Sequence, residues 1–108
     1  MRTEAAILKN LIQNEEYTRK VLPFLKQDYF TENADKNLFS TVHEFVNKYN
    51  SLPSEEALQI EMSEVKMNEE EYNESIQLLK DIQTDGEDYT DLNWLLDKTE
   101  KFCQDKAI

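Results

Sequence analysis

The run from Asp81 to Leu92 begins with the residue types that open a calcium-binding loop. Asp81, Gln83 and Asp85 stand at the first, third and fifth positions, and Gly86 occupies the sixth, where such a loop turns sharply. The twelfth position should hold a glutamate that closes the site with both carboxylate oxygens, but it holds Leu92. The sequence therefore predicts no calcium site in this run.

The other residues that could support catalysis or hold a cofactor are isolated. His43 is the only histidine and Cys103 the only cysteine, so neither has the partners of a zinc site. A nucleophilic triad would need His43 to meet a serine or Cys103 through the fold, and no glycine-rich elbow supports one. A phosphate-binding loop of the form GxxxxGK(S/T) needs two glycines, and the chain has one. We predict no catalytic, cofactor-binding or metal-binding residue in this chain, and no enzymatic activity.

Size and composition predict a single all-α domain over residues 1–108. One Gly and two Pro are too few for the frequent turns of an all-β protein, whereas Glu, Lys, Leu and Gln favour helix. No apolar run is long enough to cross a membrane, and no secretory signal opens the chain. We expect a compact orthogonal bundle of about six short helices in a reducing cytoplasm.

The negative charge of the chain is concentrated in its second half. Residues 1–50 carry seven basic and seven acidic side chains, whereas residues 51–108 carry five basic and sixteen acidic ones. Because nucleic acids attract clustered Lys and Arg, we expect no direct nucleic-acid binding and a protein partner instead. Two alternatives remain: the acidic half is merely a solvated face, or the chain is a free-standing acidic adaptor or DNA mimic that binds a host enzyme.

The first half of the chain should hold two short helices, an irregular corner and one long helix. Residues 3–13 form the first helix, and Asn14 caps the second, which Pro23 ends or kinks. An aromatic-rich corner follows, from Pro23 to Phe30. Thr31 or Asn33 then caps the long helix, which has the strongest apolar periodicity in the chain.

The second half should hold three more helices. Ser54 is a good cap for the fourth, and Asn68 for the fifth. Gly86 is expected to end the fifth helix in a left-handed conformation, and the sixth starts near Asp88 or Thr90.

The predicted core combines the aromatic corner with apolar residues at helical spacing. Its members are Leu8, Leu11, Val21, Phe24, Tyr29, Phe30, Leu38, Phe39, Val42, Phe45, Tyr49, Leu58, Ile76, Leu79, Leu92, Leu95 and Leu96.

A candidate partner surface lies on the sixth helix. Trp94 falls off the apolar stripe of that helix, beside Lys98 and Lys101. Phe102 lies on the stripe, with Leu92, Leu95, Leu96 and Cys103, but is included because it is near the end of the chain. The predicted surface is therefore Trp94, Lys98, Lys101 and Phe102. The alternative is that Trp94 covers a satellite of the core.

Several short segments, taken in order, resemble the N-terminal domain of DnaB-type hexameric replicative helicases. The resemblance covers nearly the whole chain and is strongest to the helicases of T-even-type phages. The segments are Ile7–Ile12, Glu16–Tyr17, Asp28–Phe30, Lys36–Phe39, Leu52–Ser54 and Thr99–Phe102. Bacterial members have a glycine-containing turn in mid-domain where this chain has Met67–Glu69, which favours the phage branch.

The resemblance implies that this chain is a collar domain without the ATPase motor or the helical hairpin of the family. ATP and Mg²⁺ would act in the motor, and this chain would hold no cofactor. The implied partners are other helicase subunits in the ring and primase, in the cytoplasm of a phage-infected bacterium. We expect the chain alone to be monomeric or weakly dimeric.

Overall fold

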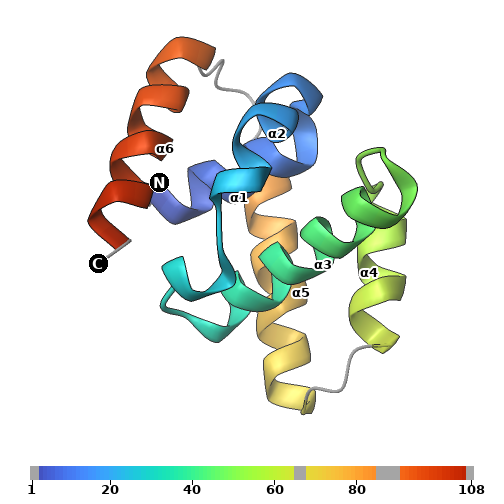
Figure 1. Cartoon of the computed structure of the whole chain (residues 1–108). Coiled ribbons are helices and arrows are strands. Elements are labelled where there is room, and N and C mark those ends of the chain that lie inside the picture. The colour runs from blue at the N-terminus through green and yellow to red at the C-terminus, as the bar shows by residue number, and fades with distance from the viewer. Residues whose placement is uncertain (1–2, 65–67, 85–90, 107–108) are drawn as a thin grey trace.

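The first two helices are joined at a single capping residue. The structure, a computed structural model, describes residues 3–64, 68–84 and 91–106 (Figure 1). Helix α1 (Thr3–Gln13) is followed by α2 (Glu15–Val21), and the Asn14 side chain accepts a hydrogen bond from the Tyr17 N–H at 3.1 Å. The buried Thr18 hydroxyl lies 2.8 Å from the carbonyl oxygen of Leu11 and 2.9 Å from that of Asn14. The predicted cap is therefore confirmed, and Thr18 fixes α2 against the end of α1.

The aromatic corner consists of two short 3₁₀ helices, η1 (Leu22–Phe24) and η2 (Gln27–Tyr29). In a 3₁₀ helix, residues three apart lie on the same side. Leu22 and Leu25 accordingly face the core, while Phe24 is 69% exposed. The prediction of Phe24 as a core residue is wrong because it extended α-helical spacing from Val21 through a segment that has three residues per turn.

Helix α3 (Asn33–Tyr49) is the longest helix among the described residues. Its N-cap position is Glu32, without a capping side-chain hydrogen bond, so neither Thr31 nor Asn33 is the cap. The helix ends at Asn50, whose left-handed backbone (φ 55°, ψ 33°) places its N–H 2.8 Å from the Val46 carbonyl oxygen. Asn tolerates this conformation better than most residues because its short polar side chain can hydrogen-bond locally.

The C-terminal end of α3 extends beyond the core. Val46 packs against the core, whereas Phe45 is only half-buried and Tyr49 is half exposed. The Tyr49 ring lies 4.7 Å from that of Phe45, and the Lys48 ammonium lies over it at 5.3 Å. The side of α3 that packs into the core runs through Leu38, Val42 and Val46. The prediction of Phe45 and Tyr49 as core residues is wrong because these two side chains lie on the neighbouring side of the helix, outside the core.

Local capping explains the three remaining helices, α4 (Glu55–Glu64), α5 (Glu69–Thr84) and α6 (Leu92–Lys106). Ser54 Oγ accepts from the Ala57 N–H at 3.1 Å, and Asn68 Oδ1 accepts from the Glu71 N–H at 2.7 Å, which confirms both predicted caps. Asp91 Oδ1 accepts from the Asn93 N–H at the start of α6. The predicted cap at Gly86 and the starts at Asp88 or Thr90 lie outside the described residues.

The helices pack around α3, which lies against α1, α4 and α5. In Figure 1, α4 lies on one side of the α3–α5 pair and α6 on the other, beside α1 and α2. The described residues contain helices and no strand, so the all-α prediction is confirmed. None of these helices has the length and apolarity needed to cross a bilayer.

The core joins the aromatic corner to α6. Phe30 lies 5.2 Å from Phe39 and 5.5 Å from Phe102, and Tyr29 meets Phe102 edge-on at 6.5 Å. Apart from Phe24, Phe45 and Tyr49, the predicted core residues are buried or packed against the core.

One buried polar contact also fixes α6. The Tyr17 hydroxyl and Thr99 Oγ1 are 2.6 Å apart, and the two side chains are 0% and 3% exposed. Burial raises the pKa of Tyr17 above its ordinary value. The phenol is therefore neutral at physiological pH, as a buried hydrogen-bonding group should be.

Candidate protein-interaction surface

Three of the four predicted surface residues on α6 are exposed. Trp94 is 52% exposed, and the Lys98 ammonium lies over its ring at 5.9 Å from the centroid. Lys101 is also exposed. A large ring and a nearby cation in contact with water suit a protein partner, because an aromatic anchor can be desolvated on binding.

The fourth predicted residue, Phe102, is not on this surface. Its ring is 7% exposed and packs against Tyr29 and Phe30. The Lys106 ammonium lies 5.9 Å from the centroid of the Phe102 ring. The prediction of an exposed Phe102 is wrong because Leu95, Thr99 and Phe102 share the buried side of α6 at helical spacing.

An apolar groove runs between α6 and the α2–η1 segment. It has a volume of about 420 Å³ and contains exposed Phe24 and half-buried Leu96 and Cys103. The Cys103 thiol donates to the carbonyl oxygen of Phe24 at 3.8 Å, and burial raises the pKa of this thiol. The sulfur is therefore a neutral, weakly polar part of the groove rather than a reactive thiolate.

Charged residues stand on opposite walls of this groove. Lys20, on α2, is exposed and forms no ion pair within the described part of the chain. Glu100, on α6, is exposed and accepts a hydrogen bond from the Gln104 side chain at 3.3 Å. The groove thus has an apolar floor, one basic wall and one acidic wall.

Sequence reasoning missed this groove because it placed Phe24 in the core. The available signal was the Leu22-Pro23-Phe24-Leu25 order, in which a proline near the start of a 3₁₀ turn leaves either the two leucines or the phenylalanine inside. The choice between them depends on how α6 packs, which is a tertiary effect.

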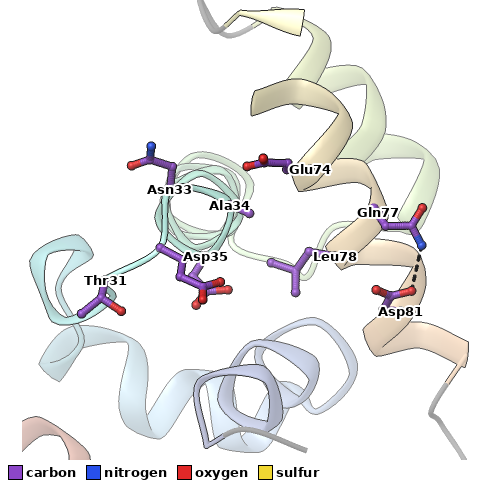
Figure 2. A pocket seen from close by; sticks show the side chains of 9 residues that line it. Thr31, Asn33, Ala34, Asp35, Glu74, Gln77, Leu78 and Asp81 are labelled. Atoms are coloured by element: carbon purple, nitrogen blue, oxygen red, sulfur yellow. Dashed lines mark hydrogen bonds between the residues drawn. The ribbon is translucent and has the colours of Figure 1, made fainter. Parts of the chain in front are cut away.

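A second hollow, between α3 and α5, is acidic. Figure 2 shows Glu74 and Leu78 of α5 pointing toward Ala34 and Asp35 at the start of α3, with the Gln77 amide donating to Asp81 at 2.9 Å. The lining includes four acidic residues and no basic one. Among the described residues, no group of His, Cys, Asp and Glu has a geometry that could hold a metal ion.

No family model matches the chain. Over 102 residues, or 94% of the chain, it is 33% identical to the DnaB-like replicative helicase of Enterobacteria phage T4. The chain matches one part of that helicase. The resemblance predicted from the sequence is thereby confirmed.

The matched part of the T4 helicase is small. The chain spans 21% of the length of that protein. Because the match covers 94% of this chain, it takes in the groove-forming helices α2 and α6 at least in part. The groove and the Trp94 surface thus belong to a segment shared with the helicase.

Proposed function

We propose that this chain is the N-terminal assembly and protein-interaction domain, or collar, of a phage replicative DNA helicase. The observation that carries the proposal is the 33% identity to part of the T4 DnaB-like helicase over 94% of this chain. That match supports a role in DNA replication. The assignment to the collar, rather than to another part, rests on the order of segments from Ile7 to Phe102 and on the all-α fold.

The chain's part in replication is to bind proteins. Its partners are neighbouring helicase subunits, which it helps to assemble into a ring, and primase. A chain with one glycine cannot form the two-glycine phosphate loop of a motor, so ATP and Mg²⁺ act elsewhere in the helicase. Its setting is the cytoplasm of the infected bacterium.

A chimera tests this proposal. This chain replaces the matching segment of the T4 helicase, and the control is the same helicase with that segment deleted. We expect the chimera to form rings in sedimentation and to bind primase, and the deletion to do both less well. Equal assembly and equal primase affinity in the deletion would refute the collar role.

The acidic second half favours a second candidate, a free-standing acidic adaptor or DNA mimic. Its supporting observation is the excess of sixteen acidic over five basic residues after residue 50. Two of these acidic residues, Glu74 and Asp81, also line the acidic hollow of Figure 2, together with Glu32 and Asp35 from the first half. The two candidates differ in the reading frame, because a helicase gene continues past Ile108 into a GxxxxGK(S/T) motif and an adaptor gene does not. They also differ in competition, because a DNA mimic displaces DNA from a basic enzyme and a collar does not.

A further inference from the structure

A basic hollow lies between the start of α1 and the last turns of α6, and it shares no lining residue with the apolar groove. Its volume is about 370 Å³, and its basic lining residues are Lys98, Lys101 and Lys106. We infer that this hollow and the neighbouring Trp94 ring bind an acidic peptide segment of another protein, with an apolar side chain of that segment over the ring. The inference goes beyond the proposed function, because it depends neither on ring assembly nor on primase.

The first argument is a concentration of positive charge in an acidic chain. The chain has 23 acidic and 12 basic residues, and five of the basic residues follow residue 50. Three of those five line the hollow. All three are exposed, and none forms an ion pair within the part of the chain that the structure describes. Their ammonium groups therefore present positive charge to solvent at one place.

The stability of α6 does not account for this arrangement. Lys98 and Lys101 are three residues apart on one helix, where like charges repel each other. A lysine in the last turn, such as Lys106, is stabilised by the negative end of the helix dipole. That effect is confined to the last turn, and Lys98 lies about two turns earlier. An anionic ligand explains the pair of lysines better than the fold does.

The second argument is an exposed aromatic ring that borders the hollow. Trp94, Lys98 and Lys101 recur at intervals of four and three residues, so they lie on one face of α6. The Trp94 ring is 52% exposed, and the Lys98 ammonium, 5.9 Å from its centroid, links it to the hollow. Tryptophan is among the side chains that contribute most to binding when a partner covers them.

The spacing on α6 defines the length of the segment that would bind. Seven residues separate Trp94 from Lys101, which is about 10 Å along a helix axis. An extended peptide covers this distance in about three residues. The ligand should therefore carry an apolar residue with acidic residues within about three positions of it.

The third argument distinguishes a peptide from a nucleic acid. Glu4 and Asp105 also line the hollow, so its charge is mixed. A nucleic-acid backbone carries a negative phosphate at every nucleotide, and some phosphates would meet these carboxylates. A peptide combines carboxylates with backbone N–H donors, and its donors can face Asp105 while its carboxylates face the lysines. The mixed lining, with one exposed aromatic ring rather than a row of stacking platforms, favours the peptide.

The experiment measures binding of a synthetic peptide to the whole 108-residue chain. The probe has blocked ends and a central leucine with acidic residues on both sides, so either chain direction places carboxylates near the lysines. Because Trp94 is the only tryptophan, covering its ring should shift the emission of the protein to shorter wavelength. We expect a dissociation constant of about 10 μM to 1 mM that rises with added salt, because exposed ion pairs are individually weak and are screened.

Anisotropy of the labelled peptide then compares variants of the chain. Lys98→Gln combined with Lys101→Gln should raise the dissociation constant about tenfold, and Trp94→Ala should raise it about fivefold. The matched control is Lys48→Gln on α3, because this exposed lysine also lies over an exposed aromatic ring, that of Tyr49, at 5.3 Å. The control should leave the constant unchanged, and circular dichroism should show every variant folded.

Two other ligands test the chemistry of the site. A peptide with Asn and Gln in place of the acidic residues should not bind, because it lacks the carboxylates. A short oligothymidylate with the same charge as the acidic peptide should bind more weakly than that peptide, because its phosphates also meet Glu4 and Asp105.

Several results would overturn the inference: no binding of the acidic peptide at about 1 mM, equal binding of the neutral peptide, or an equal loss in Lys48→Gln. Tighter binding of oligothymidylate that depends on Lys98 and Lys101 would assign the hollow to nucleic acid. Self-association of the chain that the two lysine substitutions abolish would assign it to a second copy. None of these results bears on the chimera that tests the proposed function, because that experiment measures ring assembly and primase binding.

Discussion

Removing the Tyr17–Thr99 hydrogen bond should loosen α6 from α2 by a calculable amount. The two oxygens are 2.6 Å apart, and neither side chain is more than 3% exposed. Tyr17→Phe deletes the bond and leaves the Thr99 hydroxyl buried without this partner, which costs about 1–3 kcal/mol. Thr99→Val does the same to the Tyr17 phenol, with a similar cost.

The double variant separates this bond from the packing around it. With both hydroxyls replaced by apolar groups, no buried donor or acceptor remains unpaired at this site, so the free energy of unfolding should fall by less than the sum of the single effects. We expect a coupling of about 1–2 kcal/mol. Urea unfolding followed by circular dichroism measures each value, and a change of about 1 kcal/mol moves Tm by roughly 4–8 °C in a domain near this size. Additivity of the two single effects within about 0.5 kcal/mol would refute the reasoning.

Three further outcomes follow from buried or strained positions. The raised pKa of Tyr17 means that, as pH rises, the unfolded chain loses its phenol proton before the folded chain does. The contribution of this burial to the free energy of unfolding is therefore fully present below about pH 10 and is lost as pH rises above it. Urea midpoints in alkaline buffers should fall less steeply with pH for Tyr17→Phe than for the unchanged chain, and equally steep falls would contradict this cause. Phe102→Ala should cost about 3–5 kcal/mol of unfolding free energy and Trp94→Ala less than about 1, since the first ring is 7% and the second 52% exposed; equal costs in urea unfolding would be the contrary result. Asn50→Gly should leave Tm unchanged or raise it slightly, whereas Asn50→Val should lower it. The reason is that φ of residue 50 is 55°, a conformation that glycine adopts freely and a branched Cβ disfavours. A valine variant whose Tm equals or exceeds that of the unchanged chain would count against a strained cap.

Features that depend on neighbouring residues could be predicted from the sequence. The caps at Asn14, Ser54 and Asn68 were predictable because each side-chain oxygen accepts from an N–H three residues ahead. The break at Pro23 was also predictable, because proline has no N–H to continue the α-helical hydrogen bonds. Leu22, the residue before it, nevertheless keeps α-helical angles (φ −54°, ψ −41°) and starts the 3₁₀ helix η1. The resemblance to a phage replicative helicase was also recognisable, and the 33% identity over 102 residues agrees with it.

Features that depend on packing between distant segments could not be predicted. Phe24 and Leu25 are adjacent and both apolar, and only the 3₁₀ geometry under α6 decides that the leucine is buried. Assigning Phe24 to the core also hides the groove, because Phe24 can line the groove only if its side chain is exposed. The burial of Phe102 could have been predicted, because Phe102 lies at helical spacing from Leu95 and Thr99. The rings that cover it, Tyr29 and Phe30, could not, because they lie more than seventy residues earlier in the chain.

The position of Phe102 also determines when this protein can finish folding on the ribosome. Phe30 and Phe39 are synthesised early, but Phe102, which completes their aromatic cluster, comes from α6. At bacterial-scale elongation rates of roughly 5–20 residues per second, the 72 residues from Phe30 to Phe102 take about 4–14 s to synthesise. During that interval the side of the nascent core that α6 later covers is open to water. We therefore expect the nascent chain to expose this side of its core to ribosome-associated chaperones until α6 leaves the exit tunnel.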